Sequence, residues 1–258
     1  MNIYQHFRKE EQPFIDQVLS WIEHVEKSFQ IKVTDFLDPR EQQIMHVLIG
    51  TNSDVRLYQY GGGEHAERKR AIIAPIYEEI EEASYQLILL QAHYQDKFIS
   101  LEHRDVMGAF LSLGIQRKKL GDIFVGDGTV QIVMADEIAP FVLANLTTIK
   151  RAKIKLEEQP FSSFIETEKQ WIETDQTVSS LRLDAVVKEI YNVSRKEAAD
   201  FIKKQQVKVN FKVVDDGKFI LQEGDLLSAR GKGRSKLVKI NGQTKKDKWR
   251  ITTAILSL

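Results

Sequence analysis

The chain has 258 residues, 42% of them apolar, which is enough for one large domain or for two to three small ones. It carries 37 basic and 37 acidic side chains and no cysteine, which excludes disulfides, thiolate zinc sites, iron–sulfur clusters and a cysteine nucleophile. No apolar run approaches the roughly 20 residues that span a bilayer, and the first six residues lack the apolar core of a signal peptide, so we expect a soluble, cytoplasmic protein.

Two helices are predicted in the first fifty residues. Apolar residues at helical spacing between Phe14 and Val25 predict one amphipathic helix. Asp38 followed by Pro39 gives a cap and then a proline at the first helical position, which predicts a second, short helix that extends through Leu48.

Residues 55–60 and 70–74 are typical of strands, on either side of a loop that contains Gly61, Gly62 and Gly63. Three adjacent glycines also suggest a phosphate-binding loop. No helix that begins with Lys and Ser or Thr follows them, so a flexible hairpin connection is the better interpretation. We assign residues 1–80 to an N-terminal helical and β-hairpin region.

The order of elements in the middle of the chain predicts a fold. We expect a strand, a helix, two strands, a helix capped by Asp136 and a closing strand, over residues 85–94, 103–113, 122–125, 130–134, 136–146 and 152–156. The order β-α-β-β-α-β is that of a ferredoxin-like plait, the fold of many RNA-recognition domains. We assign this RNA-binding-type plait to residues 81–158.

The plait does not by itself predict base stacking. RNA-recognition plaits stack bases on aromatic residues of their two central strands, and the expected third strand, residues 130–134, has no aromatic residue. The loop that contains Arg117, Lys118 and Lys119 is a secondary candidate for RNA contact through phosphates. A solvated basic loop is an equally good interpretation.

Charge is unevenly distributed along the chain. Residues 159–180 are polar and predict a linker, with a strand near Trp171. From Leu181 to the end there are 18 basic and 9 acidic residues, an excess of +9, so the first 180 residues carry −9. This asymmetry indicates a module for polyanions joined to a part that does not need them, and chance segregation of solvated charge is the weaker interpretation.

The basic C-terminal segment, residues 181–258, predicts two short helices followed by small strands. The first helix covers residues 181–190, and Ser194 with Glu197 forms a capping box that opens a second helix over residues 195–204. Residues 207–210, 226–229 and 237–240 are typical of strands. Asp184 is expected to cap the first helix.

The cations of this segment predict a nucleic-acid surface. Arg195 and Lys196 lie at a helix start, where the dipole and the free N–H groups favour a phosphate. Residues 230–236 alternate cations with small residues, a composition that suits a loop lying against a phosphate backbone. A solubilising basic surface is the alternative. The candidate RNA-binding residues are Arg182, Ser194, Arg195, Lys196, Lys203, Lys204, Lys208, Asn210, Arg230, Lys232, Arg234 and Lys236.

Four spaced blocks of this segment resemble the S4-type RNA-binding domain. They are Arg182-Leu183-Asp184, Ser194-Arg195-Lys196-Glu197-Ala198, Val207-Lys208-Val209-Asn210 and Gly224-Asp225. Phe211 stands where the domain usually has glycine, and Gln205-Gln206 where a small residue is common. Carried over by position, Arg182 and Arg195 are the RNA contacts that the resemblance implies most directly.

Further blocks resemble the YlmH family, and with them the similarity covers nearly the whole chain. They are residues 38–41, 66–70, 103–105 and 114–123. The resemblance implies a cytoplasmic factor without enzymatic activity that binds large-subunit ribosomal RNA and peptidyl-tRNA. Its role would be the rescue of stalled large subunits, where non-templated residues are added to trapped nascent chains. A quality-control elongation factor is a further candidate partner.

The motifs of enzymes that carry S4-type domains are mostly missing. Leu181-Arg182-Leu183-Asp184 resembles the catalytic block of pseudouridine synthases, but it lies inside the small module, and no large catalytic sheet follows it. The six histidines do not pair at the spacing of a zinc site, and we expect no metal, no cofactor and no membrane partner. An RNA-modifying enzyme that uses the S4-type domain as a targeting arm is the alternative function. A scaffold whose acidic N-terminal domains recruit a partner is a third hypothesis, and it is compatible with the RNA-binding factor.

Overall fold

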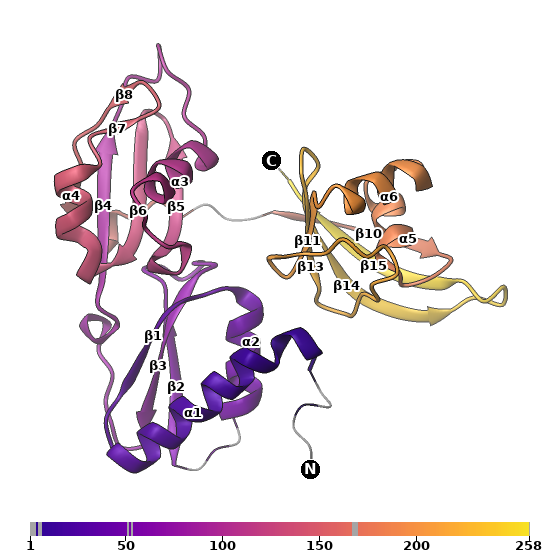
Figure 1. Cartoon of the computed structure of the whole chain (residues 1–258), viewed down its shortest axis with the longest axis horizontal. Helices are drawn as coiled ribbons and strands as arrows, with labels where there is room; N and C mark the ends of the chain where they lie inside the picture. The colour runs from indigo at the N-terminus through magenta and orange to yellow at the C-terminus, as the bar shows by residue number, and fades with distance from the viewer. Residues whose placement is uncertain (1–3, 5–6, 51, 53, 167–169, 258) are drawn as a thin grey trace. The chain divides into compact units, whose positions relative to one another are not determined.

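The computed structural model describes residues 4, 7–50, 52, 54–166 and 170–257, and the chain divides into two compact units, Met1–Thr167 and Glu168–Leu258 (Figure 1). Most of the N-terminal residues on which the expectation about a signal peptide rests lie outside the described residues. Both units combine helices with antiparallel sheets, so the fold is α+β as predicted. None of the helices in the described part of the chain combines the length and hydropathy that a membrane crossing requires.

The first unit begins with two helices packed on a three-stranded antiparallel sheet. The helices are α1 (Gln12–Ser28) and α2 (Pro39–Ile49), and the sheet has the order β1 (Lys32–Leu37), β3 (Lys69–Pro75), β2 (Val55–Tyr60). Asp38 caps α2 as predicted, because its carboxylate accepts hydrogen bonds from the amides of Arg40 and Glu41, both at 2.9 Å. The apolar faces of α1, α2 and the sheet meet in a core that includes Ile15, Met45 and Ile73.

Strand β1 was not predicted. Its burial does not alternate, and its pairing with β3 shifts register between Val33 and Phe36, so the two-residue period that identifies a strand is lost there. The other two strands of this sheet agree with the prediction to within one residue. The glycine loop between β2 and β3 connects them as a hairpin, as expected.

The predicted ferredoxin-like plait is present in the second half of the first unit. Its elements are β4 (Leu87–His93), α3 (His103–Ser112), β5 (Leu120–Gly126), β6 (Thr129–Ala135), α4 (Ala139–Asn145) and β9 (Glu157–Gln159). All pairs are antiparallel, in the order β5-β6-β4-β9, with the first and third strands at the centre. Helices α3 and α4 pack on one face of the sheet, around Phe110 and Ile132.

Two details of the plait prediction were wrong. The closing strand is Glu157–Gln159, whereas residues 152–156 contribute only β8 (Ala152–Lys153), which pairs with β7 (Thr148–Ile149). Ile154 and Leu156 are nevertheless buried, so their alternation with lysine reports burial rather than sheet pairing. Asp136 does not cap α4 with its side chain, since a 3₁₀ turn over Asp136–Ile138 leads into that helix.

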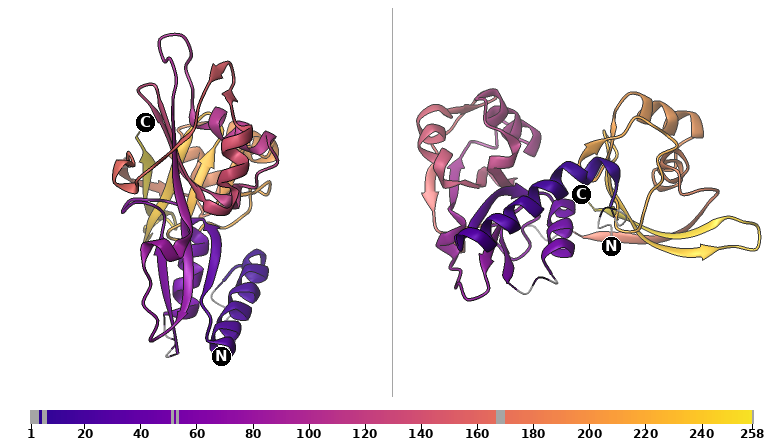
Figure 2. Two further views of the ribbon diagram at one scale, coloured as in Figure 1. Left: turned by 90° about the vertical axis from the view of Figure 1, so that its left-hand side faces the viewer. Right: turned by 60° about the horizontal axis from the view of Figure 1, so that its bottom comes forward.

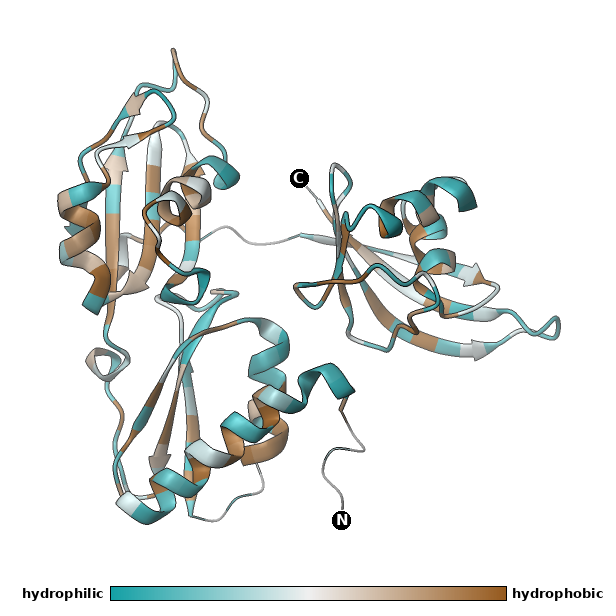
Figure 3. Cartoon of the chain, in the orientation of Figure 1, coloured by the Kyte–Doolittle hydropathy of each residue, from teal (hydrophilic) through white to brown (hydrophobic). Residues whose placement is uncertain are grey.

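The second unit is a six-stranded antiparallel sheet with two helices on one face (Figures 1 and 2). The helices are α5 (Leu183–Ile190) and α6 (Arg195–Lys203). The strand order is β10 (Trp171–Val178), β15 (Trp249–Leu256), β14 (Gly233–Gln243), β13 (Leu226–Ala229), β11 (Val207–Val209), β12 (Lys212–Val213). Figure 3 shows apolar and polar residues alternating along these strands, and the apolar positions face the helices.

The predicted linker at residues 159–180 is mostly ordered structure. A 3₁₀ turn covers Phe161–Ser163, and β10 pairs with β15 over its whole length, from Trp171 opposite Leu256 to Val178 opposite Trp249. The strand expected near Trp171 is therefore present as β10, although it extends to Val178, its only buried residue. Strand β15 was not predicted, although its β-branched and aromatic residues favour a strand.

Candidate nucleic-acid interface

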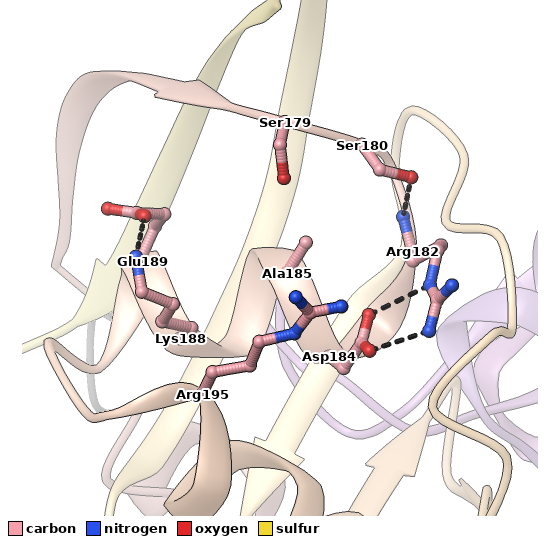
Figure 4. A pocket seen from close by; sticks show the side chains of 8 residues that line it. All are labelled: Ser179, Ser180, Arg182, Asp184, Ala185, Lys188, Glu189 and Arg195. Atoms are coloured by element: carbon pink, nitrogen blue, oxygen red, sulfur yellow. Dashed lines mark hydrogen bonds and ion pairs between the residues drawn. The ribbon is translucent and has the colours of Figure 1, made fainter.

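The two arginines singled out from the sequence line one pocket of about 290 Å³ (Figure 4). It lies between the end of β10, helix α5 and the start of α6. Its walls consist of Ser179, Ser180, Arg182, Asp184, Ala185, Lys188, Glu189 and Arg195. The fold therefore brings together Arg182 and Arg195, which are thirteen positions apart in the sequence.

Arg182 is held in place by a buried carboxylate. Its Nε lies 3.1 Å from Oδ1 of Asp184 and its Nη2 lies 2.7 Å from Oδ2, a two-pronged ion pair. The side chain of Asp184 is 10% exposed and that of Arg182 is 34% exposed. Guanidinium carries five N–H donors, so this geometry fixes the group and leaves part of it accessible from the pocket.

Asp184 does not cap α5, contrary to the prediction. The first amides of the helix are satisfied by the backbone of a loop, because Leu183 N donates to the carbonyl of Phe219 at 2.8 Å and Asp184 N to that of Gly217 at 3.1 Å. The Asp184 carboxylate therefore does not bind the helix amides, and it orients Arg182 instead. The Arg-x-Asp spacing was the only sequence signal for this role.

Arg195 reaches the pocket from the first position of α6. The capping box was predicted correctly: Ser194 Oγ accepts a hydrogen bond from Glu197 N at 3.1 Å, and Glu197 Oε2 accepts one from Ser194 N at 2.8 Å. Arg195 is exposed, and no carboxylate in the described part of the chain pairs with it. Figure 4 shows its side chain directed toward the pocket that Arg182 lines from the other side.

The pocket has a net positive charge. Arg182 is neutralised by Asp184, and Lys188 by Glu189 at 2.5 Å, which leaves the charge of Arg195 uncompensated. Serine hydroxyls at Ser179 and Ser180 add polar groups to the wall. The pocket therefore offers two guanidinium groups, of which that of Arg195 is not neutralised, beside the start of α6. This combination favours the binding of a phosphate-sized anion. Lys188 and the two serines were not among the predicted site residues.

Loss of the Ser194 hydroxyl is expected to destabilise the second unit. Replacing a capping serine with alanine costs about 1 kcal/mol, because one helix amide loses its acceptor. For a domain of this size the Ser194→Ala variant should melt roughly 4 °C or more below the wild type. Differential scanning calorimetry measures this shift. The exposed Ser112→Ala substitution is the control, and equal melting temperatures for both variants would contradict a structural role for the cap.

The remaining predicted residues divide between two faces of the second unit. Lys196 and Lys203 are exposed on α6, and Lys204 is exposed directly after it, on the helix side. Lys208, Arg234 and Lys236 alternate with buried neighbours on β11 and β14, so they point to the sheet face opposite the helices. The sequence prediction treated these cations as one surface, and the structure separates them.

The predicted cationic loop at residues 230–236 is largely strand. Only Arg230 and Lys232 lie in the tight turn between β13 and β14, where both are exposed. Arg234 lies over the ring of Phe211 at 5.8 Å, and Lys236 over the ring of Trp171 at 4.4 Å. These two cations are therefore partly used in packing against aromatic rings.

Asn210 is used inside the domain. Its Nδ2 donates to Asp225 Oδ1 at 2.8 Å, and its Oδ1 accepts from Leu226 N at 3.0 Å. Phe211 follows with φ of 67°, in the left-handed region that glycine adopts most easily. Gln205, in the other departure from the S4 pattern, is also left-handed at φ 57°. Both departures therefore place a residue with a side chain at a left-handed backbone position.

Part of the sheet face that RNA-recognition domains use is covered in this plait. Phe161 and Phe164 pack with Leu89 and Val133 on the face opposite α3 and α4. The segment of residues 161–165 is held on this face by the fully buried Gln131. Its Nε2 donates to the carbonyl of Ser163 at 2.8 Å, and its Oε1 accepts from the amide of Ile165 at 2.7 Å. The covered part of the face is therefore used for packing within the first unit.

The secondary candidates Arg117, Lys118 and Lys119 bind other parts of the same unit. Lys118 and Lys119 pair with Asp35 of β1 at 3.1 and 2.6 Å, and Lys119 also pairs with Glu137 at 2.8 Å. Arg117 donates to the carbonyls of Leu120 and Gly121. The basic loop therefore connects the N-terminal sheet to the plait.

Acid should weaken this junction. Burial raises the pKa of Asp35, but hydrogen bonds from Lys119 and Lys118 outweigh it, and the net pKa lies below the ordinary 3.8. Burial also opposes the effect of Lys119 on Glu137, whose net pKa is lowered from 4.5. A lowered pKa stabilises the fold above the ordinary pKa, and the contribution is lost as the pH falls through the folded-state pKa.

We therefore expect the melting temperature of the first unit to fall with acidification below about pH 4. The Asp35→Asn variant should show a weaker dependence in this range, because one of the titrating carboxylates is gone. Thermal melts followed by circular dichroism from pH 6 to pH 2.5 measure both curves. Glu158→Gln, an exposed substitution on β9, serves as the control. Identical slopes for wild type and Asp35→Asn would contradict the role of the ion pair.

Within the described ranges, no cluster of three or more His, Asp and Glu side chains could hold a metal ion. The pocket between α5 and α6 contains neither a histidine nor a serine with a base beside it. Its lining supplies two guanidinium groups, which can bind an anion.

Comparisons with known proteins cover nearly the whole chain. Family models match residues 10–78 ("YlmH, N-terminal"), 81–163 ("Putative RNA-binding domain in YlmH") and 181–227 ("S4 domain"). The chain is 46% identical over 251 residues to the Bacillus subtilis (strain 168) protein named "Ribosome-associated protein quality control protein P2", with 97% of each chain covered. The solved structure of "Cell division protein ylmH from Streptococcus pneumoniae" matches with a TM-score of 0.57 and 29% identity, over 64% of this chain and all of that one. The chain belongs to the YlmH family of S4-domain proteins.

Proposed function

We propose that the chain is an RNA-binding factor without catalytic activity that acts on large ribosomal subunits in the cytoplasm, and that it holds ribosomal RNA and tRNA through its S4 domain. The pocket that joins Arg182 to Arg195 carries the proposal. The name of the B. subtilis relative supports a ribosomal partner and a place in quality control. Rescue of stalled subunits, with tailing of the nascent chain, is the process in which such a factor would steady the tRNA beside an elongation factor.

The absence of catalysis is supported by the surroundings of Asp184. This aspartate lies in a block that resembles the catalytic block of pseudouridine synthases, yet both of its oxygens bond to Arg182 and its side chain is almost buried. A nucleophilic carboxylate must reach its substrate, and this one is directed to a neighbouring guanidinium. The alternative of an RNA-modifying enzyme therefore finds no support in this geometry.

Co-sedimentation of the full chain with purified large subunits tests the proposal. Binding should weaken as salt rises, with a log–log slope of about −0.7 to −0.9 per phosphate neutralised. Removal of residues 168–258 should abolish it. Binding that is indifferent to ionic strength, or that survives this deletion, would contradict the proposal.

Mass mapping of ribosomal RNA and tRNA, from cells with and without the protein, tests the enzymatic alternative. We expect the same set of modified nucleotides in both strains. A modification that is missing without the protein, and that returns with the wild type but not with Asp184→Asn, would establish catalysis instead.

A further inference from the structure

An exposed apolar pocket lies in the N-terminal part of the first unit, outside the S4 domain. It has a volume of about 280 Å³ and lies between the end of α1, the start of β2 and the end of β3. Six apolar residues and two carboxylates line it: Val25, Phe29, Val55, Pro75, Ile76, Tyr77, Glu26 and Asp54. Phe29 and Tyr77 are each 67% exposed. Grouped apolar side chains of this kind on a surface mark an interaction site more often than single ones do.

Phe29 is in an unfavourable backbone conformation. It ends α1 with φ of 58° and ψ of 22°, in the left-handed region, while its amide donates to the carbonyl of Val25 at 2.9 Å. Glycine is the usual residue at such a helix end, and an aromatic residue there is uncommon. Because its ring is mostly exposed, packing within the unit does not compensate for the strain. Residues that break local rules without an internal gain are typical of functional sites.

The charges at this pocket select the class of partner. Glu26 and Asp54 line it, and no lysine or arginine does. Glu26 Oε1 accepts a hydrogen bond from Asn52 Nδ2 at 2.9 Å, which fixes its carboxylate at the rim. Glu78 and Glu79, both exposed, follow Tyr77 directly. Carboxylates repel nucleic-acid phosphates and attract lysine and arginine, so the partner is a basic protein segment rather than RNA.

We propose that this pocket binds a lysine- and arginine-rich segment of a partner protein, with one large apolar side chain of that segment inserted between Phe29 and Tyr77. The pocket volume of about 280 Å³ lies just below the range of about 300–1,000 Å³ that small-molecule sites occupy, so the pocket suits a single large side chain better than a whole ligand. The flanking cations of the segment pair with Glu26 and Asp54. The S4 domain then contacts RNA while the N-terminal part contacts protein, so the charge asymmetry of the chain corresponds to two kinds of partner.

Fluorescein-labelled ten-residue peptides of defined sequence are the probes. One peptide has a central Leu-Phe pair flanked by four Lys or Arg on each side. In a second peptide the pair is Ser-Ser, and in a third the flanks are Glu. Fluorescence anisotropy with the full chain should show binding of the first peptide at least tenfold tighter than of the second, and no binding of the third. Equal binding of the first two peptides would reduce the site to general charge attraction and overturn the proposal.

Phe29→Gly separates binding from folding. Glycine relieves the left-handed strain, so the melting temperature should stay the same or rise by about 2 °C, whereas affinity for the first peptide should fall about tenfold. Tyr77→Ser should weaken binding similarly. Glu26→Gln, which keeps an acceptor for Asn52, should weaken it about threefold at low salt and less at high salt. Phe98→Gly removes an aromatic residue that is 81% exposed elsewhere in the unit, and it should leave binding unchanged.

Three results would overturn the proposal. The first is unchanged peptide binding by both Phe29→Gly and Tyr77→Ser. The second is a loss of large-subunit RNA binding in these variants, measured with protein-free ribosomal RNA, which would make the patch an RNA contact. The third is a wild-type dimer in sedimentation velocity that Phe29→Gly dissociates, which would make a second copy of the chain the occupant. None of these results affects the arginine pocket of the S4 domain.

Discussion

Replacing Arg182 and Arg195 with alanine should reduce the affinity of the full chain for large subunits about 100-fold. Each arginine is expected to make charge-assisted hydrogen bonds to a phosphate, and bonds of this kind contribute roughly 1.5–3 kcal/mol each. Two such losses at the lower limit amount to about 3 kcal/mol, or two decades of affinity. The log–log salt slope should also become shallower by about 1.5, since two phosphate contacts are gone. Co-sedimentation over a range of salt concentrations measures both quantities.

The design must separate lost contacts from lost structure. Arg182→Ala alone would leave the buried carboxylate of Asp184 unpaired, so the test variant also carries Asp184→Asn. Asp184→Asn alone retains both arginines and shows how much the orientation of Arg182 matters. Arg56→Ala with Arg151→Ala and Glu158→Gln replaces three exposed residues of the first unit and gives the same change in net charge. If the test variant is folded and binds like this control, the pocket is not the RNA site.

Arg70→Ala should unfold the first unit at markedly lower temperature. Arg70 is buried, and its guanidinium donates to the carbonyls of Thr34 at 2.6 Å, Tyr85 at 3.2 Å and Gln86 at 3.0 Å. It also lies 3.5 Å from a carboxylate oxygen of Glu137. Alanine removes a buried cation and the side-chain donor of these three carbonyls, and it leaves Glu137 paired with Lys119 alone, which together costs about 3–5 kcal/mol. The free energy of unfolding from urea titration measures the loss.

The two units provide an internal reference for this experiment. The partners of Arg70 named above all lie in the first unit, so the unfolding midpoint of the second unit should not change. Arg56→Ala, an exposed arginine on the neighbouring strand β2, should change the stability of the first unit by no more than about 0.5 kcal/mol. A loss below about 1 kcal/mol for Arg70→Ala would show that solvent replaces the lost donor and that the buried junction is not needed.

The structural features that could be predicted from the sequence are those that depend on neighbouring residues or on the order of the elements. The cap at Asp38 and the capping box of Ser194 and Glu197 involve residues within three positions of each other, so their geometry follows from a few neighbouring residues. The plait followed from the order of its elements. The positions of Arg182 and Arg195 relative to each other required only that α5 and α6 pack side by side, which their apolar faces favour.

Features that depend on distant partners could not be predicted. The role of Asp184 changed because the backbone of residues 217–219 satisfies the amides at the start of α5. The loop at Arg117–Lys119 acquired its role from Asp35, more than eighty residues earlier, and nothing near it in the sequence indicates that pairing. The separation of Arg234 and Lys236 from the α6 cations followed from the pleat of β14, once residues 233–236 proved to be strand rather than loop.

The electrostatic role of the S4 domain is the central claim, and a reconstruction of the full chain on the large subunit at side-chain resolution tests it most directly. Each of Arg182 and Arg195 should lie within hydrogen-bond distance of an RNA phosphate at the pocket between α5 and α6. A complex in which neither arginine contacts RNA, while the chain is bound through another surface, would contradict it.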